Sequence, residues 1–216
     1  MLQIQKFTFN PLAENTYIIY DHTRACIFVD PGCATKHEEA VLSAFILEHD
    51  LEVTKVVNTH CHIDHIVGNA YVKQTYGVPL AIHPQDAFLL ALSPQYAQQY
   101  GMTYCEPTVA EQMLEAGDKI KVGASQLQVL HVPGHSPGHI ALYSAEDKFC
   151  VVGDVLFRNH VGRIDLPGGD YHTLIKSIQE QLLTLEDETI VYSGHGAKTT
   201  IGAERQQNPF LRNITP

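Results

Sequence analysis

Residues 58–69 read NTHCHIDHIVGN, and this stretch places four ligand-type residues within six positions: His60, His62, Asp64 and His65. The stretch begins at the end of VTKVVNT, a β-branched run that is too short for a helix and predicts a strand. On an extended segment, residues two apart point to the same side, so His60 and His62 share one direction. Asp64 and His65 begin a turn into a helix and aim at a second point close by. The spacing therefore favours two neighbouring cations over a single one.

Three further ligand-type residues follow strand-like runs later in the chain. They are His135 after LQVLHVPG, Asp154 after FCVVG and His195 after TIVYSG, and a glycine stands immediately before each of them. Loops at the strand ends of one sheet edge carry function on a rigid scaffold, so we expect these residues to join the first four. Five imidazoles and two carboxylates exceed the three or four protein ligands of one zinc ion. The inventory predicts two divalent ions that share one carboxylate.

The first half of the chain alternates strands and helices. LQIQKFTF, NTYIIYD, ACIFVD and VPLAIH predict further strands, with turn residues between them. Thr35 and Glu38 form the spacing of a capping box, which predicts a helix from there to about His49. Residues 66–76 and a segment near 85–92 predict two more helices.

The second half begins with an irregular stretch. Residues 93–117 contain two prolines and two glycines and predict an inserted loop or short helices. Whether their aromatic and methionine side chains cover a substrate or pack on the surface stays open: Tyr96, Tyr100, Met102 and Tyr104.

Regular patterns return after residue 117. KIKVG, LQVLHVP, HIALYSA and FCVVGD predict antiparallel strands, TIVYSGH a last strand, and 201–207 a short helix. Asp170 caps a helix whose apolar stripe predicts a core face: Tyr171, Leu174, Ile175, Ile178 and Leu182. Two halves of strands followed by helices predict an α/β fold of four α/β/β/α layers, with residues 1–216 as one domain.

Composition excludes several classes of protein. The net charge of −10 and the pI near 5.6 argue against nucleic-acid or anionic-membrane binding, which need a basic face. No apolar run approaches the roughly 18 residues of a membrane span, and MLQIQKFTFN is not a signal peptide. The five cysteines form no C-x-x-C pair, so we expect free thiols in the cytoplasm. On the extended segment Cys61 points away from its histidine neighbours, which predicts a buried spectator.

The motifs together resemble a known family. THCHIDH, VPGHSPGH, VVGDVLF and YSGHG occur in the order found in the metallo-β-lactamase superfamily. GDVLFRNHVGRIDLPGGD and GHGAKTTIGAERQQNPF resemble, more closely, the glyoxalase II-like hydrolases in their short bacterial form. The resemblance implies the four-layer fold and assigns the ligands: His60, His62 and His135 to a first metal, Asp64, His65 and His195 to a second, and Asp154 to both. Zinc is the default for such nitrogen-rich sites, and iron or manganese also suits a mixed set.

The resemblance also implies an activity, which is thioester hydrolysis by a hydroxide that bridges the metals and that Asp64 orients. A thiolate leaves without protonation, which suits a site with no clear general acid outside the ligand set. Asp30 either fixes the ring nitrogen of a ligand or is a plain turn residue. Arg163 either grips a substrate carboxylate or is ion-paired. His139 either supports a ligand or is structural.

Two departures from full-length glyoxalase II put glutathione specificity in question. The segment after His195 is too short for the C-terminal helical domain of the longer enzymes. Asp165 stands where they place a tyrosine. Two alternative functions remain open. A persulfide dioxygenase of the same superfamily would use one iron held by His60, His135 and Asp154, and a protein without enzymatic activity would only bind metal.

Overall fold

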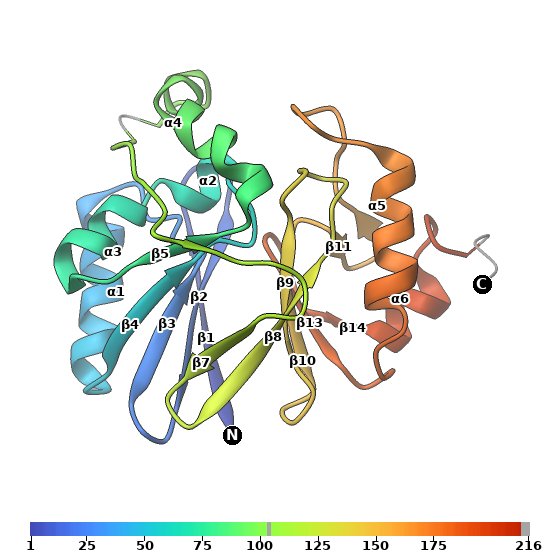
Figure 1. Cartoon of the computed structure of the whole chain (residues 1–216), viewed down its shortest axis with the longest axis horizontal. Coiled ribbons are helices and arrows are strands. Elements are labelled where there is room, and N and C mark those ends of the chain that lie inside the picture. Colours follow the sequence, from blue (N-terminus) through green and yellow to red (C-terminus); the bar gives the residue numbers. More distant parts are fainter. Residues whose placement is uncertain (103–104, 213–216) are drawn as a thin grey trace.

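Two six-stranded sheets lie face to face, with helices on both outer surfaces, in a computed structural model that describes residues 1–102 and 105–212 (Figure 1). The first sheet has the order β1-β2-β3-β4-β5-β6, formed by Leu2–Phe9, Glu14–Asp21, Ala25–Val29, Glu52–Val57, Leu80–Ile82 and Gln112–Met113. The second has the order β14-β13-β10-β9-β8-β7, formed by Thr199–Thr200, Ile190–Ser193, Phe149–Gly153, Ile140–Ser144, Ser125–His131 and Lys119–Val122. The α/β/β/α prediction is confirmed.

The helices cover the two outer faces. Over the first sheet lie α1 (Lys36–Glu48), α2 (Ile63–Ile66), α3 (Asn69–Tyr76), the 3-10 turn η1 (Pro84–Asp86) and α4 (Ala87–Gln99). Over the second lie α5 (Tyr171–Ser177), its π-helical continuation η2 (Ile178–Leu182) and α6 (Ile201–Gln207). A small hairpin of β11 (Leu156–Phe157) and β12 (His160–Val161) stands beside the second sheet. No helix in the described ranges is long and apolar enough to cross a membrane.

The four layers enclose three hydrophobic cores, because the central strands are apolar on both faces. In β3, Ile27 faces the core between the sheets, whereas Phe28 faces the core under the first set of helices. In β10, Val151 faces the central core, and Val152 faces the core under α5 and α6. Successive residues of a strand point to opposite faces, so an unbroken apolar run fills two cores at once.

The predicted capping box begins α1. Thr35 accepts a hydrogen bond from the backbone N–H of Glu38, and the Glu38 carboxylate accepts one from the Thr35 N–H. The four strands predicted between 119 and 154 are antiparallel neighbours, as expected. The last predicted strand, β13, pairs with β10 in parallel.

The helix predicted over 66–76 is wrong in its boundaries. The chain forms α2, breaks at Val67 and Gly68, and continues as α3. At the break the Gly68 N–H donates to the Pro31 carbonyl at 2.8 Å, and a β-carbon on Gly68 would lie 2.6 Å from that oxygen. Contact with the turn after β3 therefore sets the break, and local periodicity carries no sign of such a contact.

Two further helix predictions need correction. The helix expected near 85–92 runs on to Gln99 as α4, through Pro94, because its buried face of Leu90, Ser93 and Ala97 continues across the proline. The stripe on α5 and η2 is narrower than predicted, since Leu174, Ile178 and Leu182 are buried while Tyr171 is exposed. The sequence patterns also missed the two-residue strands β6, β11, β12 and β14, which are too short to show a period.

Candidate functional site

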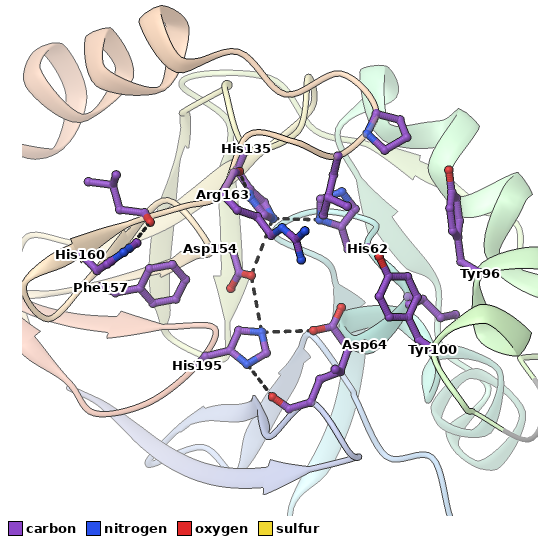
Figure 2. Close-up of a pocket in the computed structure, with 15 residues that line it drawn as sticks. His62, Asp64, Tyr96, Tyr100, His135, Asp154, Phe157, His160, Arg163 and His195 are labelled. Atoms are coloured by element: carbon purple, nitrogen blue, oxygen red, sulfur yellow. Dashed lines mark hydrogen bonds and ion pairs between the residues drawn. The ribbon is translucent and has the colours of Figure 1, made fainter. Parts of the chain in front are cut away.

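The seven predicted ligand residues lie together at one end of the sandwich. His60, His62, Asp64 and His65 follow β4 of the first sheet, whereas His135, Asp154 and His195 follow β8, β10 and β13 of the second. Figure 2 shows the side chains from the two sheets pointing toward a common centre. Both sheets contribute residues to the site, because β4, β8, β10 and β13 all end on the same side of the sandwich.

The first three-residue group contains His60, His62 and His135, each offering a ring nitrogen within 4.8 Å of the other two. His62 Nδ1 lies 2.8 Å from His135 Nε2. Burial lowers the pKa of His62 to about 3 and lowers the pKa of His60 well below its usual value. The rings are therefore neutral at pH 7, which is the form that binds a metal ion.

The second group contains Asp64, His65 and His195 under the same distance limit. Asp64 Oδ2 lies 3.1 Å from His195 Nε2 and 3.6 Å from His65 Nε2. A third group, Asp30, His60 and His65, meets the same limit and shares one histidine with each of the other two. The first two groups divide the HCHIDH stretch as expected, with two ligand-type residues in each.

Asp154 stands between the two groups. Its Oδ2 lies 3.7 Å from His135 Nε2 of the first group and 3.5 Å from His195 Nε2 of the second, and its Oδ1 lies 3.5 Å from His65 Nε2. Gly194 makes room for this carboxylate, because a β-carbon there would overlap Asp154 Oδ1.

Charge in the second group is balanced within the chain. Burial opposes ionisation of Asp154, but His65 and His195 outweigh it and hold the Asp154 pKa well below its usual value. Burial likewise opposes protonation of His195, but hydrogen bonds to Asp154 and Asp64 raise its pKa to about 9. In the absence of a cation, the charges of the two carboxylates are thus balanced by protons on the imidazoles.

The polar atoms present fit divalent metal ions. His60 Nε2, His65 Nε2 and Asp154 Oδ1 are buried and make no hydrogen bond within the described residues. Lone pairs left unused in a buried site are costly unless a ligand takes them up. Imidazole and carboxylate are the donors that Zn, Fe and Mn accept.

Asp30 lies directly behind the second group, at the end of β3. Its Oδ2 is 3.1 Å from His65 Nδ1, and its two oxygens accept hydrogen bonds from the Thr59 N–H and hydroxyl. This position matches the supporting role that the sequence left open. Glu14, which we did not predict, is also fully buried near His65, with its Oε1 3.8 Å from the same Nδ1. Glu14 is the first residue of β2, and nothing in the surrounding sequence marks it as a neighbour of His65.

His139 supports Asp154 from below. The Asp154 N–H donates to His139 Nε2 at 3.1 Å, and the His139 ring stacks on His60 with centroids 4.6 Å apart. His139 therefore contacts two of the predicted ligand residues, Asp154 and His60.

Asp86 was also missed. This buried carboxylate accepts hydrogen bonds from the Cys61 N–H at 3.0 Å, the Ser136 hydroxyl at 2.8 Å and the Gly138 N–H at 2.6 Å. It joins the segment of the first histidines to the segment of His135, although it lies 25 residues from Cys61 and 50 from Ser136 in sequence. Cys61 is buried in the hydrophobic core under the helices of the first sheet, as expected of a spectator.

A pocket of about 470 Å³ opens over the centre. Two side chains of the irregular 93–117 stretch line it, Tyr96 and Tyr100, whereas Met102 is buried in the outer core. Tyr104 lies outside the described residues. Arg163 also lines the pocket, and its guanidinium donates from Nε and Nη2 to the two oxygens of Asp165, both at 2.7 Å. Its backbone carbonyl accepts from His135 Nδ1 at 2.8 Å.

Comparison with known proteins agrees with this architecture. Residues 9–195 match the family model of the metallo-beta-lactamase superfamily. The chain is 37% identical over 202 residues to the hydroxyacylglutathione hydrolase GloC of Haemophilus influenzae, which covers 93% of each chain. It superposes on the crystal structure of the BLEG-1 B3 metallo-beta-lactamase with a TM-score of 0.89 at 32% identity, covering 97% of this chain and 100% of that one. The chain also superposes on the crystal structure of TTHA1623 in a di-iron-bound form, with a TM-score of 0.86 at 37% identity, covering 96% of this chain and 100% of that one. This chain belongs to the metallo-β-lactamase superfamily and is a metallo-hydrolase of that family.

Proposed function

We propose that this protein hydrolyses thioesters at a centre of two divalent cations, in the manner of a hydroxyacylglutathione hydrolase. The observation that carries the proposal is the pair of three-residue groups joined by Asp154 beneath one pocket. His60, His62 and His135 would hold the first ion, Asp64, His65 and His195 the second, and Asp154 both. The named activity of the GloC relative supports the thioester class. We propose zinc as the resident metal, with iron as the alternative because TTHA1623 has a di-iron form.

Cations held there would acidify bound water to a pKa of about 7 and polarise a carbonyl oxygen. The chain itself supplies the positioning. Asp64 would accept a hydrogen bond from the attacking water and orient it. Asp30 holds the His65 ring from behind, Glu14 adds a second negative charge near the same nitrogen, and His139 accepts a hydrogen bond from the backbone of Asp154.

A thioester fits the groups that line the pocket. Hydrolysis forms a C–O bond and breaks the C–S bond, and the thiol leaves as a thiolate that takes its proton from water. A thiolate with a parent pKa near 8.5 needs no general acid, whereas an amine or alkoxide does. Apart from the proposed ligands, the polar side chains on the described pocket wall are Tyr96, Tyr100, His160 and Arg163.

The second group of residues supports the hydrolase over the persulfide dioxygenase. One iron held by His60, His135 and Asp154 would leave Asp64 and His195 without a role, although they lie 3.1 Å apart in the site. A dinuclear centre uses both residues.

Metal analysis combined with a thioesterase assay tests the proposal. Protein produced with ample zinc or iron should carry close to two metal ions per chain and release free thiol from S-lactoylglutathione. Asp154→Ala should lose both ions, because Asp154 contacts both groups. Asp118→Ala is the matched control, since that carboxylate only caps a turn before β7 through the Glu115 N–H.

Two outcomes would contradict the proposal. A stoichiometry that stays at one ion, together with oxygen uptake on glutathione persulfide, would favour the dioxygenase. Two bound ions without thiol release from any thioester would leave a metal site with a different activity.

A further inference from the structure

The pocket wall above the metal centre is mainly apolar. Eight of its fifteen lining residues are aliphatic, aromatic or proline, and five are proposed ligands. Phe157 stands on one side of the centre, and Tyr96 and Tyr100 stand on the other (Figure 2). The part of a substrate that extends away from the reacting carbon therefore lies between aromatic side chains.

Arg163 is the single arginine or lysine among the described residues that line this pocket. The Nε/Nη2 edge of its guanidinium is taken by Asp165, with Nε–Oδ1 and Nη2–Oδ2 distances of 2.7 Å, and the Asp165 carboxylate neutralises the charge of the arginine. A carboxylate binds arginine through the same two donors. An anionic group on a substrate would compete with Asp165 for this edge, and at the other edge it would meet an arginine whose charge Asp165 already neutralises.

We propose that the pocket favours thioesters whose thiol half is uncharged and apolar, and that Asp165 sets this preference by occupying Arg163. The inference rests on the proposed thioesterase function and narrows its substrate class. Glutathione carries two carboxylates and one ammonium group, so its thioesters are the disfavoured case. The pair is exposed, with 57% of the Arg163 side chain and 63% of the Asp165 side chain accessible, so the preference is moderate rather than absolute.

The test compares two lactoyl thioesters that differ only in the thiol half, glutathione in one and the neutral N-acetylcysteamine in the other. For the metal-loaded wild-type protein we expect the higher kcat/KM on the neutral thioester. Asp165→Asn should raise the ratio of glutathione to neutral kcat/KM by about two- to fivefold, through a lower KM for the glutathione thioester. Adding Arg163→Gln to Asp165→Asn should remove that rise, because the arginine freed by the first change is then absent.

Glu188→Gln provides the matched control. It breaks an ion pair of similar exposure, Lys148 to Glu188 at 2.6 Å, between residues that do not line the pocket. It should leave the ratio within error of wild type. Calorimetric titration of the metal-free proteins with S-methylglutathione gives a readout without turnover, and Asp165→Asn should bind it several-fold more tightly than wild type.

The outcomes separate the two proposals. Absence of hydrolysis of both thioesters by protein that carries two metal ions overturns the thioesterase function. Hydrolysis of both with a wild-type preference for the glutathione thioester, or with a ratio that Asp165→Asn does not change, overturns only the inference about Asp165.

Discussion

Replacing Asp86 with alanine should destabilise the protein and weaken the first metal group selectively. The carboxylate accepts hydrogen bonds from the Cys61 N–H, the Ser136 hydroxyl and the Gly138 N–H, and all three donors are buried. Asp86→Ala leaves these donors without an acceptor, on two segments that come from different sheets.

The magnitude follows from the three contacts. A hydrogen bond to a charged group contributes about 1.5–3 kcal/mol, so three give at most about 9 kcal/mol. Part of this is offset, because burial raises the pKa of Asp86 and removing the carboxylate relieves its desolvation. A net loss of about 3–5 kcal/mol in the free energy of unfolding is expected, because each buried donor left without an acceptor costs about 1–3 kcal/mol. For a chain of this length that is a fall in Tm of roughly 10 °C.

The selectivity distinguishes a positioning role from a purely structural one. Two residues of the first group, His60 and His62, flank Cys61, and the third, His135, adjoins Ser136. In the second group, His65 and His195 are held instead by other contacts, with Asp30 and with the Leu12 carbonyl. Metal titration of Asp86→Ala should therefore show one tight site retained and one weakened by tenfold or more.

Glu204→Ala is the control for this experiment. Glu204 is equally buried and accepts from the Asn159 N–H, the Thr199 hydroxyl and the Asn208 amide, so its loss should destabilise the fold by a similar amount. Urea unfolding of the metal-free proteins measures stability, and calorimetric titration measures metal binding. The reasoning about Asp86 is refuted if both metal sites weaken equally in Asp86→Ala, or if Glu204→Ala weakens the first site to the same extent.

Three other predictions follow from the geometry. Gly194→Ala should reduce the metal content of both groups, because the new β-carbon would overlap Asp154 Oδ1 and lie 2.6 Å from His65 Cε1. An unchanged metal content would show that the backbone at Gly194 shifts freely. Burial and the His131 ring, which stacks on His83 at 4.2 Å, lower the pKa of His83 to about 4, below the unfolded value of about 6.5. The folded state then binds fewer protons, so the stability that His83 contributes above pH 6.5 is lost as the pH falls toward 4. In metal-free protein, His83→Phe should remove about 1–2 kcal/mol of the stability loss between pH 6.5 and 4. If the free energy of unfolding falls equally with pH in the wild type and the variant, this reasoning is contradicted. Removal of metal by a chelator should reversibly lower the free energy of unfolding, by about 3 kcal/mol for each ion present at one hundred times its Kd, and should therefore lower the Tm. A Tm that does not change in scanning calorimetry would argue against ions held between the sheets.

The sequence predicted those parts of the molecule that depend on local pattern. Apolar runs such as ACIFV identified strands buried on both faces, and the Thr35 capping box marked the start of α1. The ligand-type residues could be identified because they occur in the short segments that follow strands, in loops or, for Asp64 and His65, in the short helix α2. The same reasoning divided the HCHIDH stretch between two centres, and two of the three distance groups follow that division.

Features that depend on tertiary contact were not predictable. Asp86 sits in a short turn before α4, and its three donors lie 25, 50 and 52 residues away along the chain. Glu14 begins a strand and contacts His65 only after the sheet has formed. The break at Gly68 depends on Pro31, and the continuation of α4 through Pro94 depends on packing. In each case the deciding partner belongs to another element.

The distribution of the ligand residues over the two sheets has a consequence for biosynthesis. The two groups assigned to the ions each take two members from the stretch 60–65 and one from the second half of the chain. During synthesis from the N-terminus, the first of them lacks a member until residue 135 has been made, and the second until residue 195. Until then the nascent chain holds two of the three histidines of the first group, and of the second group Asp64 and His65, with Asp30 beside His60 and His65. Under the proposed assignment the two ions are acquired in order, and the second is captured only after β13 has joined its sheet.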